Sequence, residues 1–117
     1  MGSFATQDED FIVTVFKELK KKNFYFLDSL ATSKSVGYKI SKKVGIKFTK
    51  RSIFLDNNPN PDYIQNQLME LAKKSEEDGQ AIGIGHDRNS TLKVLKEEIP
   101  KLAKEGYEFV FVSELAE

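Results

Sequence analysis

The chain has 117 residues, of which 39% are hydrophobic and 31% charged, a composition typical of a globular domain rather than a disordered segment. That length allows one sizeable core, so we expect a single domain over residues 1–117. The absence of cysteine excludes disulfides and thiolate metal sites, and no run approaches the roughly 18 apolar residues that a membrane span requires. We expect no signal peptide in this segment, because its N-terminal residues lack a basic region followed by an apolar one.

The net charge of zero conceals an uneven distribution along the chain. Residues 17–51 contain eleven lysines and arginines against two acidic residues, a balance of +9, whereas residues 52–117 have a balance of −6. A basic face can bind nucleic acid or another polyanion, but lysine-rich helix faces in contact with solvent explain the pattern more simply. Arg51 and Arg88 are the only arginines and no basic motif is interleaved with aromatic residues, so we do not expect a nucleic-acid partner.

The first half of the chain predicts two helices, each followed by an extended segment. The first helix is expected to begin after Asp8 as N-cap, since apolar residues then recur at helical spacing. The short apolar run FYFLDS, residues 24–29, predicts a buried strand. Ser33 is expected to cap a second helix that ends at Gly45, and residues 45–56 are expected to be extended.

The second half begins with a clear helix signal. Asn60 is expected to act as the N-cap and Pro61 to occupy the first helical position, where its missing N–H costs nothing. Gly79 is expected to end this helix. The segment AIGIG, residues 81–85, predicts the next strand.

The last two predicted elements are a helix and a strand. The helix contains apolar residues at helical spacing and ends at Gly106, and Pro100 inside it is expected to kink or split it. YEFVFVSEL, residues 107–115, predicts the final strand. Alternation of strands and helices is typical of a parallel sheet with crossover helices. We therefore predict an α/β fold with about four parallel strands.

Polar residues follow the apolar runs at regular intervals. The runs end at Asp28, Asp56, His86 and Ser113, with steps of 28, 30 and 27 residues. If the strands are parallel, these four side chains share the carboxyl edge of the sheet, where α/β proteins bind ligands. We interpret this edge as functional, although strands also end simply where polarity begins.

His86 is the only histidine, and three roles are open to it. With Asp28 and Asp56 on the same edge it suits general acid–base work, because a carboxylate orients an imidazole. The same three residues could supply part of a zinc or manganese site. A structural histidine at a strand end is the third alternative.

Two motif assignments are excluded by the residues around the candidates. Ser29 has no G-x-S-x-G elbow around it, so a serine nucleophile is not expected. Gly83 and Gly85 lack the third glycine of a dinucleotide fingerprint. Their absent Cβ atoms instead predict the close approach of a ligand or another part of the chain.

Several segments together carry a family resemblance. They are FYFLDSLATSKSVGYKISKKVGI, RSIFLDN, AIGIGHDRNSTLKVLKEEIPKL and VFVSEL. In order, spacing and wording the chain resembles the divergent polysaccharide deacetylase family along almost its whole length. The resemblance implies a distorted (β/α) barrel like that of the NodB-type carbohydrate esterases. It also implies metal-dependent removal of acetyl groups from a polysaccharide, with a divalent metal such as zinc, in a family whose members are mostly exported.

The resemblance places several residues near the cleft of such a barrel. His86 matches the late histidine of the family at the rim of the site, as an acid or a substrate contact. The residues expected to be catalytic are His86 and Asp28, and those expected to contact substrate are Ser29, Arg51, Asp56 and Asn57. The chain departs from the family at Leu30, where relatives commonly carry a basic residue.

The start of the chain resembles the end of a histidine motif of the family. Met1-Gly2-Ser3 would follow that histidine directly, so we expect this chain to correspond to the C-terminal half of the barrel. The resemblance puts the metal ligands upstream, and we assign no metal ligand and no cofactor to this chain alone. We expect it to be inactive by itself and to form a homodimer or associate with the missing N-terminal half.

Two rival hypotheses remain at this stage. One is a non-enzymatic module that binds carbohydrate or a polyanion through the basic 17–51 face. The other is a small metallo-esterase that builds its site from two chains, each contributing His86.

Overall fold

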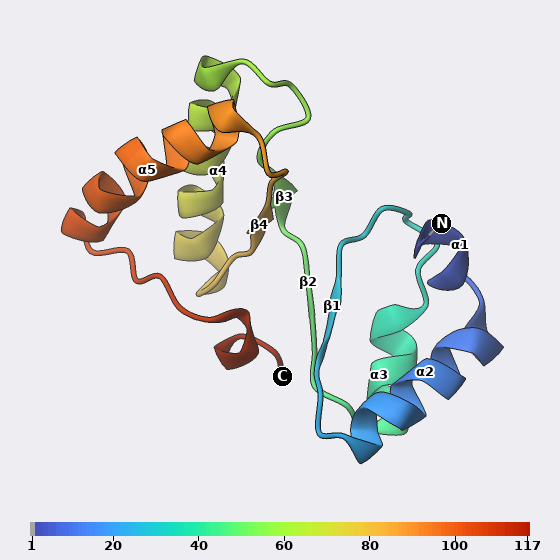
Figure 1. Cartoon of the computed structure of the whole chain (residues 1–117). Helices are drawn as coiled ribbons and strands as arrows, with labels where there is room; N and C mark the ends of the chain where they lie inside the picture. The colour runs from blue at the N-terminus through green and yellow to red at the C-terminus, as the bar shows by residue number, and fades with distance from the viewer. Residues whose placement is uncertain (1) are drawn as a thin grey trace. The chain divides into compact units, whose positions relative to one another are not determined.

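The structure is a computed structural model that describes residues 2–117, with side chains from Phe4 onward. Met1, the first residue of the Met1-Gly2-Ser3 motif, lies outside the described residues. The chain forms two compact units, Met1–Lys50 together with Val112–Glu117, and Arg51–Phe111, here named the first and the second unit. Each unit contains one pair of parallel strands with helices beside it (Figure 1). The predicted α/β class is thus confirmed, although the strands form two pairs.

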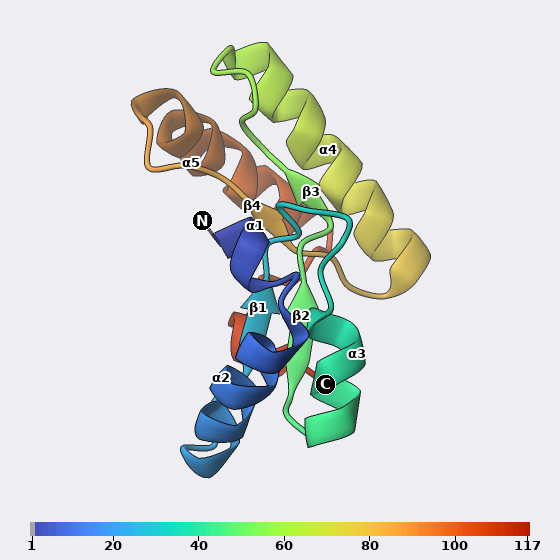
Figure 2. The ribbon, with the colours of Figure 1, turned by 90° about the vertical axis from the view of Figure 1, so that its right-hand side faces the viewer.

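The first unit joins two helices to the pair of strands β1 and β2. Its elements are α1 Gly2–Ala5, α2 Glu9–Lys21, β1 Phe26–Asp28, α3 Gly37–Val44, β2 Phe48–Lys50 and the 3-10 helix η1 Val112–Glu114. Phe26 lies opposite Phe48 in the parallel register. Both α2 and α3 lie on the same side of this pair (Figures 1 and 2). The core between them consists of Ile12, Phe16, Ile40, Ile46 and Phe48.

The predicted start of α2 is confirmed. The Asp8 side chain accepts a hydrogen bond from the backbone N–H of Phe11 at 3.1 Å, which satisfies a donor that the helix itself cannot pair. Acidic residues occupy the first turn and lysines the last, so both ends of the helix dipole meet favourable charge.

The predicted start of α3 is wrong, because the helix begins at Gly37 rather than after Ser33. The hydroxyl of Ser35 accepts from the backbone N–H of Gly37 at 3.1 Å and donates to the carboxylate of Asp28. These bonds hold residues before Gly37 in a loop. The end at Gly45 is confirmed, with φ of 85° in the left-handed region that glycine adopts without strain.

The second unit contains the strand–helix–strand order of β1, α3 and β2 again, followed by one more helix. Its elements are β3 Ile53–Phe54, α4 Pro61–Asp78, β4 Gly83–Ile84 and α5 Asn89–Lys104. Its core consists of Leu55, Leu68, Ala72 and Leu102. The Asn60 side chain accepts from the backbone N–H of Asp62 at 2.8 Å, Pro61 opens α4, and Gly79 ends it. The predicted limits of this helix are confirmed.

Three sequence predictions about the strands and helices need correction. The extended segment 45–56 divides into β2 and β3, which pair with different partners. Helix α5 continues through Pro100, so this proline does not split it, and the buried face of the helix, which includes Val94 and Leu102, outweighs the lost hydrogen bond. Residues 107–115 form no strand: Val112–Glu114 is a 3-10 helix, and β-forming side chains need a partner strand to form one.

No helix within residues 2–117 combines the length and the apolar character that crossing a membrane demands.

Candidate functional site

Asp56 and His86 meet because of the register of the two strands that precede them. β3 and β4 are parallel, with Phe54 opposite Ile84, and the two polar residues each follow two positions later. The backbone N–H of His86 donates to Oδ2 of Asp56 at 2.6 Å, and Nδ1 of the imidazole lies 2.8 Å from Oδ1. One carboxylate therefore contacts both the backbone and the ring of the same histidine.

Helix α5 supplies two further contacts to Asp56 from its N-terminal end. Thr91, buried in the first turn, donates its hydroxyl to Oδ2 of Asp56 at 2.6 Å. The guanidinium Nη1 of Arg88, the residue before the helix, donates to the backbone carbonyl of Asp56 at 2.8 Å. These bonds connect the ends of two strands to the start of the helix that follows.

The electrostatics of the cluster favour an ionised Asp56. Its side chain is fully buried, and burial alone raises the pKa of a carboxyl. The hydrogen bonds from Thr91 and from the ring and backbone of His86, together with attraction to the imidazole, outweigh burial and lower the pKa of Asp56 from 3.8 to about 2. A carboxylate only accepts hydrogen bonds, so Nδ1 of the neutral His86 ring carries the proton. In that tautomer Nε2 carries no hydrogen and can accept a hydrogen bond.

The imidazole of His86 contacts Asp56 through Nδ1, and most of its side chain is exposed to solvent. The side chain of His86 is 60% exposed, whereas that of Asp56 is 0% exposed. A histidine oriented by a buried carboxylate and accessible to solvent can donate or accept a proton at a bound molecule. The arrangement thus provides an oriented acid–base group.

The two glycines before His86 make room for this cluster and for the core beneath it. A Cβ at Gly85 would lie 3.1 Å from Cγ2 of Thr91 and 3.4 Å from Oδ2 of Asp56. A Cβ at Gly83 would lie 2.8 Å from Cδ2 of Leu71, closer than real Cβ atoms approach. The sequence predicted that a ligand or another part of the chain approaches these glycines closely. In the structure, side chains of the second unit do so.

Asp28, the other predicted catalytic residue, lies in the first unit at the end of β1. It is 3% exposed, and its carboxylate accepts from the hydroxyl of Ser35 and, at 2.8 Å, from the backbone N–H of Leu30. Leu30 adopts a positive φ of 53°, a conformation that side chains other than glycine rarely take. Within its unit Asp28 therefore fixes the loop between β1 and α3.

The remaining predicted residues lie in the segments before or after the strands. Ser29 and Asn57 are exposed and directly follow Asp28 and Asp56. The guanidinium carbon of Arg51 lies 3.8 Å from the centre of the Phe54 ring, in a cation–π contact. Ser113, which was predicted to follow the final strand, lies in η1 and follows no strand.

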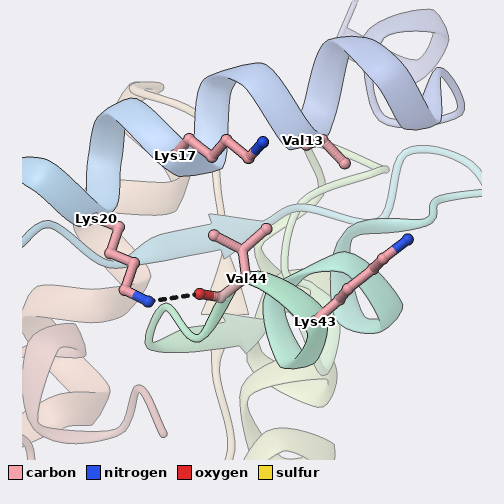
Figure 3. A pocket seen from close by; sticks show the side chains of 5 residues that line it. All are labelled: Val13, Lys17, Lys20, Lys43 and Val44. Atoms are coloured by element: carbon pink, nitrogen blue, oxygen red, sulfur yellow. Dashed lines mark hydrogen bonds between the residues drawn. The ribbon is translucent and has the colours of Figure 1, made fainter.

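The basic face predicted for residues 17–51 includes exposed lysines of α2 and α3. A groove between α2 and α3 is lined by Val13, Lys17, Lys20, Lys43 and Val44 (Figure 3). Nζ of Lys20 donates to the carbonyl of Val44 at 2.9 Å and so pairs an oxygen at the end of α3 (Figure 3). This is the arrangement expected of lysines on solvated helix faces.

The donor set fits a metal ion poorly. Both oxygens of Asp56 already accept hydrogen bonds, and the ring of His86 has only Nε2 to offer. Across the described residues, no three histidine, cysteine, aspartate or glutamate side chains lie together as a group that could hold a metal.

Comparison with known proteins decides the family. The model of the family described as divergent polysaccharide deacetylase matches residues 1–116. The chain belongs to this family. All four segments that carried the resemblance, including the one with Asp56 and the one with His86, fall inside the matched range.

Two bacterial relatives of this divergent polysaccharide deacetylase chain are similar in sequence. An uncharacterized protein of Haemophilus influenzae is 38% identical over 96 residues, which cover 82% of this chain and 34% of the relative. The uncharacterized protein YibQ of Escherichia coli is 31% identical over 105 residues, which cover 87% of this chain and 32% of YibQ. The chain thus spans about a third of the length of the curated relatives it matches.

One solved structure supports the fold. The crystal structure of an uncharacterized protein from Agrobacterium tumefaciens C58 matches with a TM-score of 0.92 at 22% identity. The match covers 95% of this chain and 45% of that protein. At this level of identity the likeness shows the fold alone.

Sequence inspection missed two members of the cluster. Thr91 and Arg88 were not predicted as site residues, although both lie within five positions of His86. A threonine on the buried side of the first helical turn after a strand-end histidine is the signal that points to Thr91. The hydrogen bond from Arg88 to a backbone carbonyl leaves no such trace in the sequence.

Proposed function

We propose that this chain provides His86 as the acid–base group of a carbohydrate deacetylase, with Asp56 orienting the imidazole. The observation that carries the proposal is the double contact between the buried carboxylate and His86, which fixes the ring while 60% of its side chain stays exposed. Membership of the divergent polysaccharide deacetylase family supplies the reaction class, removal of an acetyl group from a polysaccharide.

In this proposal His86 exchanges its proton at Nε2. The ionised Asp56 holds Nδ1–H, so the ring stays in one tautomer and presents Nε2 to a bound sugar. During acetyl transfer to water, Nε2 takes the proton that the attacking water releases and then donates it to the departing sugar nitrogen or oxygen. Ser29, Arg51 and Asn57 remain proposed substrate contacts, and Asp28 a second proposed catalytic residue.

We propose that the chain is inactive alone. The parent reaction of the family depends on a divalent metal, and the residues described in this chain include no group of three ligands for one. Metal ligands would then come from another part of a family protein. In the same proposal the two strand pairs correspond to the C-terminal half of a distorted (β/α) barrel.

We further propose that two copies of the chain associate through residues 109–111. Phe109, Val110 and Phe111 are 50%, 39% and 81% exposed, a run of apolar surface that water contacts unfavourably. The segment has the β-branched and aromatic residues of a strand, and identical segments can pair around a two-fold axis. Association with the remainder of a family protein is the alternative outcome of the same test.

The proposal is tested by recording the NMR signals of the His86 imidazole while sugars are added. Because the chain has one histidine, its imidazole gives a single set of NMR signals. We expect N-acetyl chito-oligosaccharides to shift these signals and maltotetraose, which has no acetyl groups, to leave them unchanged. Acetate release is expected to be absent with zinc present, and metal analysis to find no stoichiometric ion.

Two results would contradict the proposal. Signals of His86 that stay fixed at saturating chito-oligosaccharide would remove this residue from the site. Stoichiometric zinc with acetate release, both lost in His86→Ala, would show that the chain builds a complete site, as in the two-chain metallo-esterase hypothesis.

A further inference from the structure

The carboxylate of Asp56 receives hydrogen bonds from two residues. Two come from His86 itself, through its backbone N–H and its ring. The third comes from the hydroxyl of Thr91 on α5, which reaches the same Oδ2 that the backbone N–H of His86 contacts. Thr91 is therefore the donor that fixes the carboxylate independently of the histidine it orients.

The hydroxyl of Thr91 has a defined direction. Asp56 is ionised and accepts only, so the threonine must donate. Thr91 is 1% exposed and Asp56 0%, so no bulk water can replace this bond if the hydroxyl is removed. Loss of the donor would leave Oδ2 with the backbone N–H of His86 as its one remaining hydrogen bond of this cluster, so the carboxylate would be held less firmly beside Nδ1.

We propose that Thr91 is the positioning residue of the site, and that its hydroxyl holds the Asp56 carboxylate in the orientation that keeps His86 in the Nδ1–H tautomer. This inference rests on the proposed function for its catalytic meaning, but the positioning itself is a property of the folded chain. The threonine acts through Asp56 and does not touch substrate.

The methyl group of Thr91 offers a competing explanation. Its Cγ2 lies against Gly85, where an added Cβ would come within 3.1 Å, so the side chain also packs under the strand end. If packing alone mattered, a variant that keeps the methyl would preserve the site. Thr91→Val keeps the methyl and removes the hydroxyl, and Thr91→Ser does the reverse.

The test measures the tautomer of the single histidine. The full chain is labelled with nitrogen-15 in the imidazole, and the two ring nitrogens are recorded above the pH at which the ring titrates. In the wild type we expect a protonated Nδ1 and an unprotonated Nε2. In Thr91→Val we expect the ratio of Nδ1–H to Nε2–H tautomer to fall about tenfold, the size expected for loss of one charge-assisted hydrogen bond.

Two controls separate positioning from general damage. Thr91→Ser is expected to keep the wild-type ratio. Thr14→Val makes the same chemical change at an exposed hydroxyl of α2, which donates to the carbonyl of Asp10, and is expected to change nothing at His86. If Thr91→Val does not fold, Thr91→Ser decides alone: retention of the ratio supports the inference, and its loss overturns it.

The outcomes distinguish this inference from the proposed function. A folded Thr91→Val with the wild-type tautomer ratio would overturn the role of Thr91, whatever His86 does with sugars. A lowered tautomer ratio in Thr91→Val would establish the positioning role of Thr91. If chito-oligosaccharides also left the His86 signals of the wild type unchanged, the deacetylase proposal alone would be contradicted.

Discussion

The backbone N–H of His86 lies 2.6 Å from Oδ2 of Asp56, and the ring Nδ1 of the same histidine lies 2.8 Å from Oδ1. The carboxylate thereby contacts the histidine twice, once at its main chain and once at its side chain. The contact joins residues 30 positions apart, and it depends on the parallel register of β3 and β4. Both the stability of the fold and the proposed chemistry of His86 therefore depend on the carboxylate of Asp56.

Asp56→Asn is expected to destabilise the fold. An amide places an NH₂ group where the carboxylate accepts from Thr91 and His86, so one buried donor loses its acceptor, at a cost of about 1–3 kcal/mol. Unfolding in urea measures the change. Asp62→Asn, at an exposed position in the first turn of α4, is the matched control and is expected to cost less than about 1 kcal/mol. Equal losses in the two variants would contradict the role given to Asp56.

The stability of the chain is expected to fall in acid. The pKa of Asp56 is about 2 in the folded chain against 3.8 without these contacts, so the folded state favours the ionised form. This contributes about 2 kcal/mol above pH 5, which is lost progressively as the pH falls through 4 toward 2. Urea unfolding of the wild type and of Asp56→Asn across this range isolates the contribution. The difference between them is expected to shrink as the pH falls, and a constant difference would contradict the assignment.

Gly83→Ala is expected to cost about 1–3 kcal/mol through overpacking. The new Cβ would lie 2.8 Å from Cδ2 of Leu71 and 3.2 Å from Cδ2 of Leu55, so at least one leucine must move. Leu71→Ala removes the first of these contacts. Its cost is therefore expected to be smaller in the Gly83→Ala background than in the wild type, and strict additivity of the two changes would count against this contact.

The exposed segment at residues 109–111 is expected to mediate self-association. Light scattering is expected to give twice the monomer mass of 13.3 kDa, and Phe109→Ser with Phe111→Ser to return the chain to a monomer. Phe24→Ser changes a side chain that is 57% exposed elsewhere and is expected to leave the dimer intact. A wild type that stays monomeric at all concentrations would contradict dimer formation and favour a partner from the rest of a family protein.

The sequence predicted the helices most accurately where the signal was local. Asp8 and Asn60 cap α2 and α4 through bonds to residues two or three positions away, and Gly45 and Gly79 end α3 and α4 through their own backbone conformation. The start of α3 failed because Ser35 bonds to Asp28, seven positions earlier, and no local rule foresees that competition.

The sequence by itself determined the family, the α/β class and the pairing of apolar runs with the polar residues Asp56 and His86 that follow them. The α/β class and the ends of the apolar runs depend on composition, helix caps and spacing, which act over a few residues, whereas the family rests on the resemblance of four sequence segments to its motifs. Only the tertiary structure decided the register that brings Asp56 to His86, the arrival of Thr91 from α5, and the absence of a strand at residues 107–115. The physical reason is that strand pairing and buried hydrogen bonds join distant parts of the chain, so each depends on a partner that the local sequence does not name.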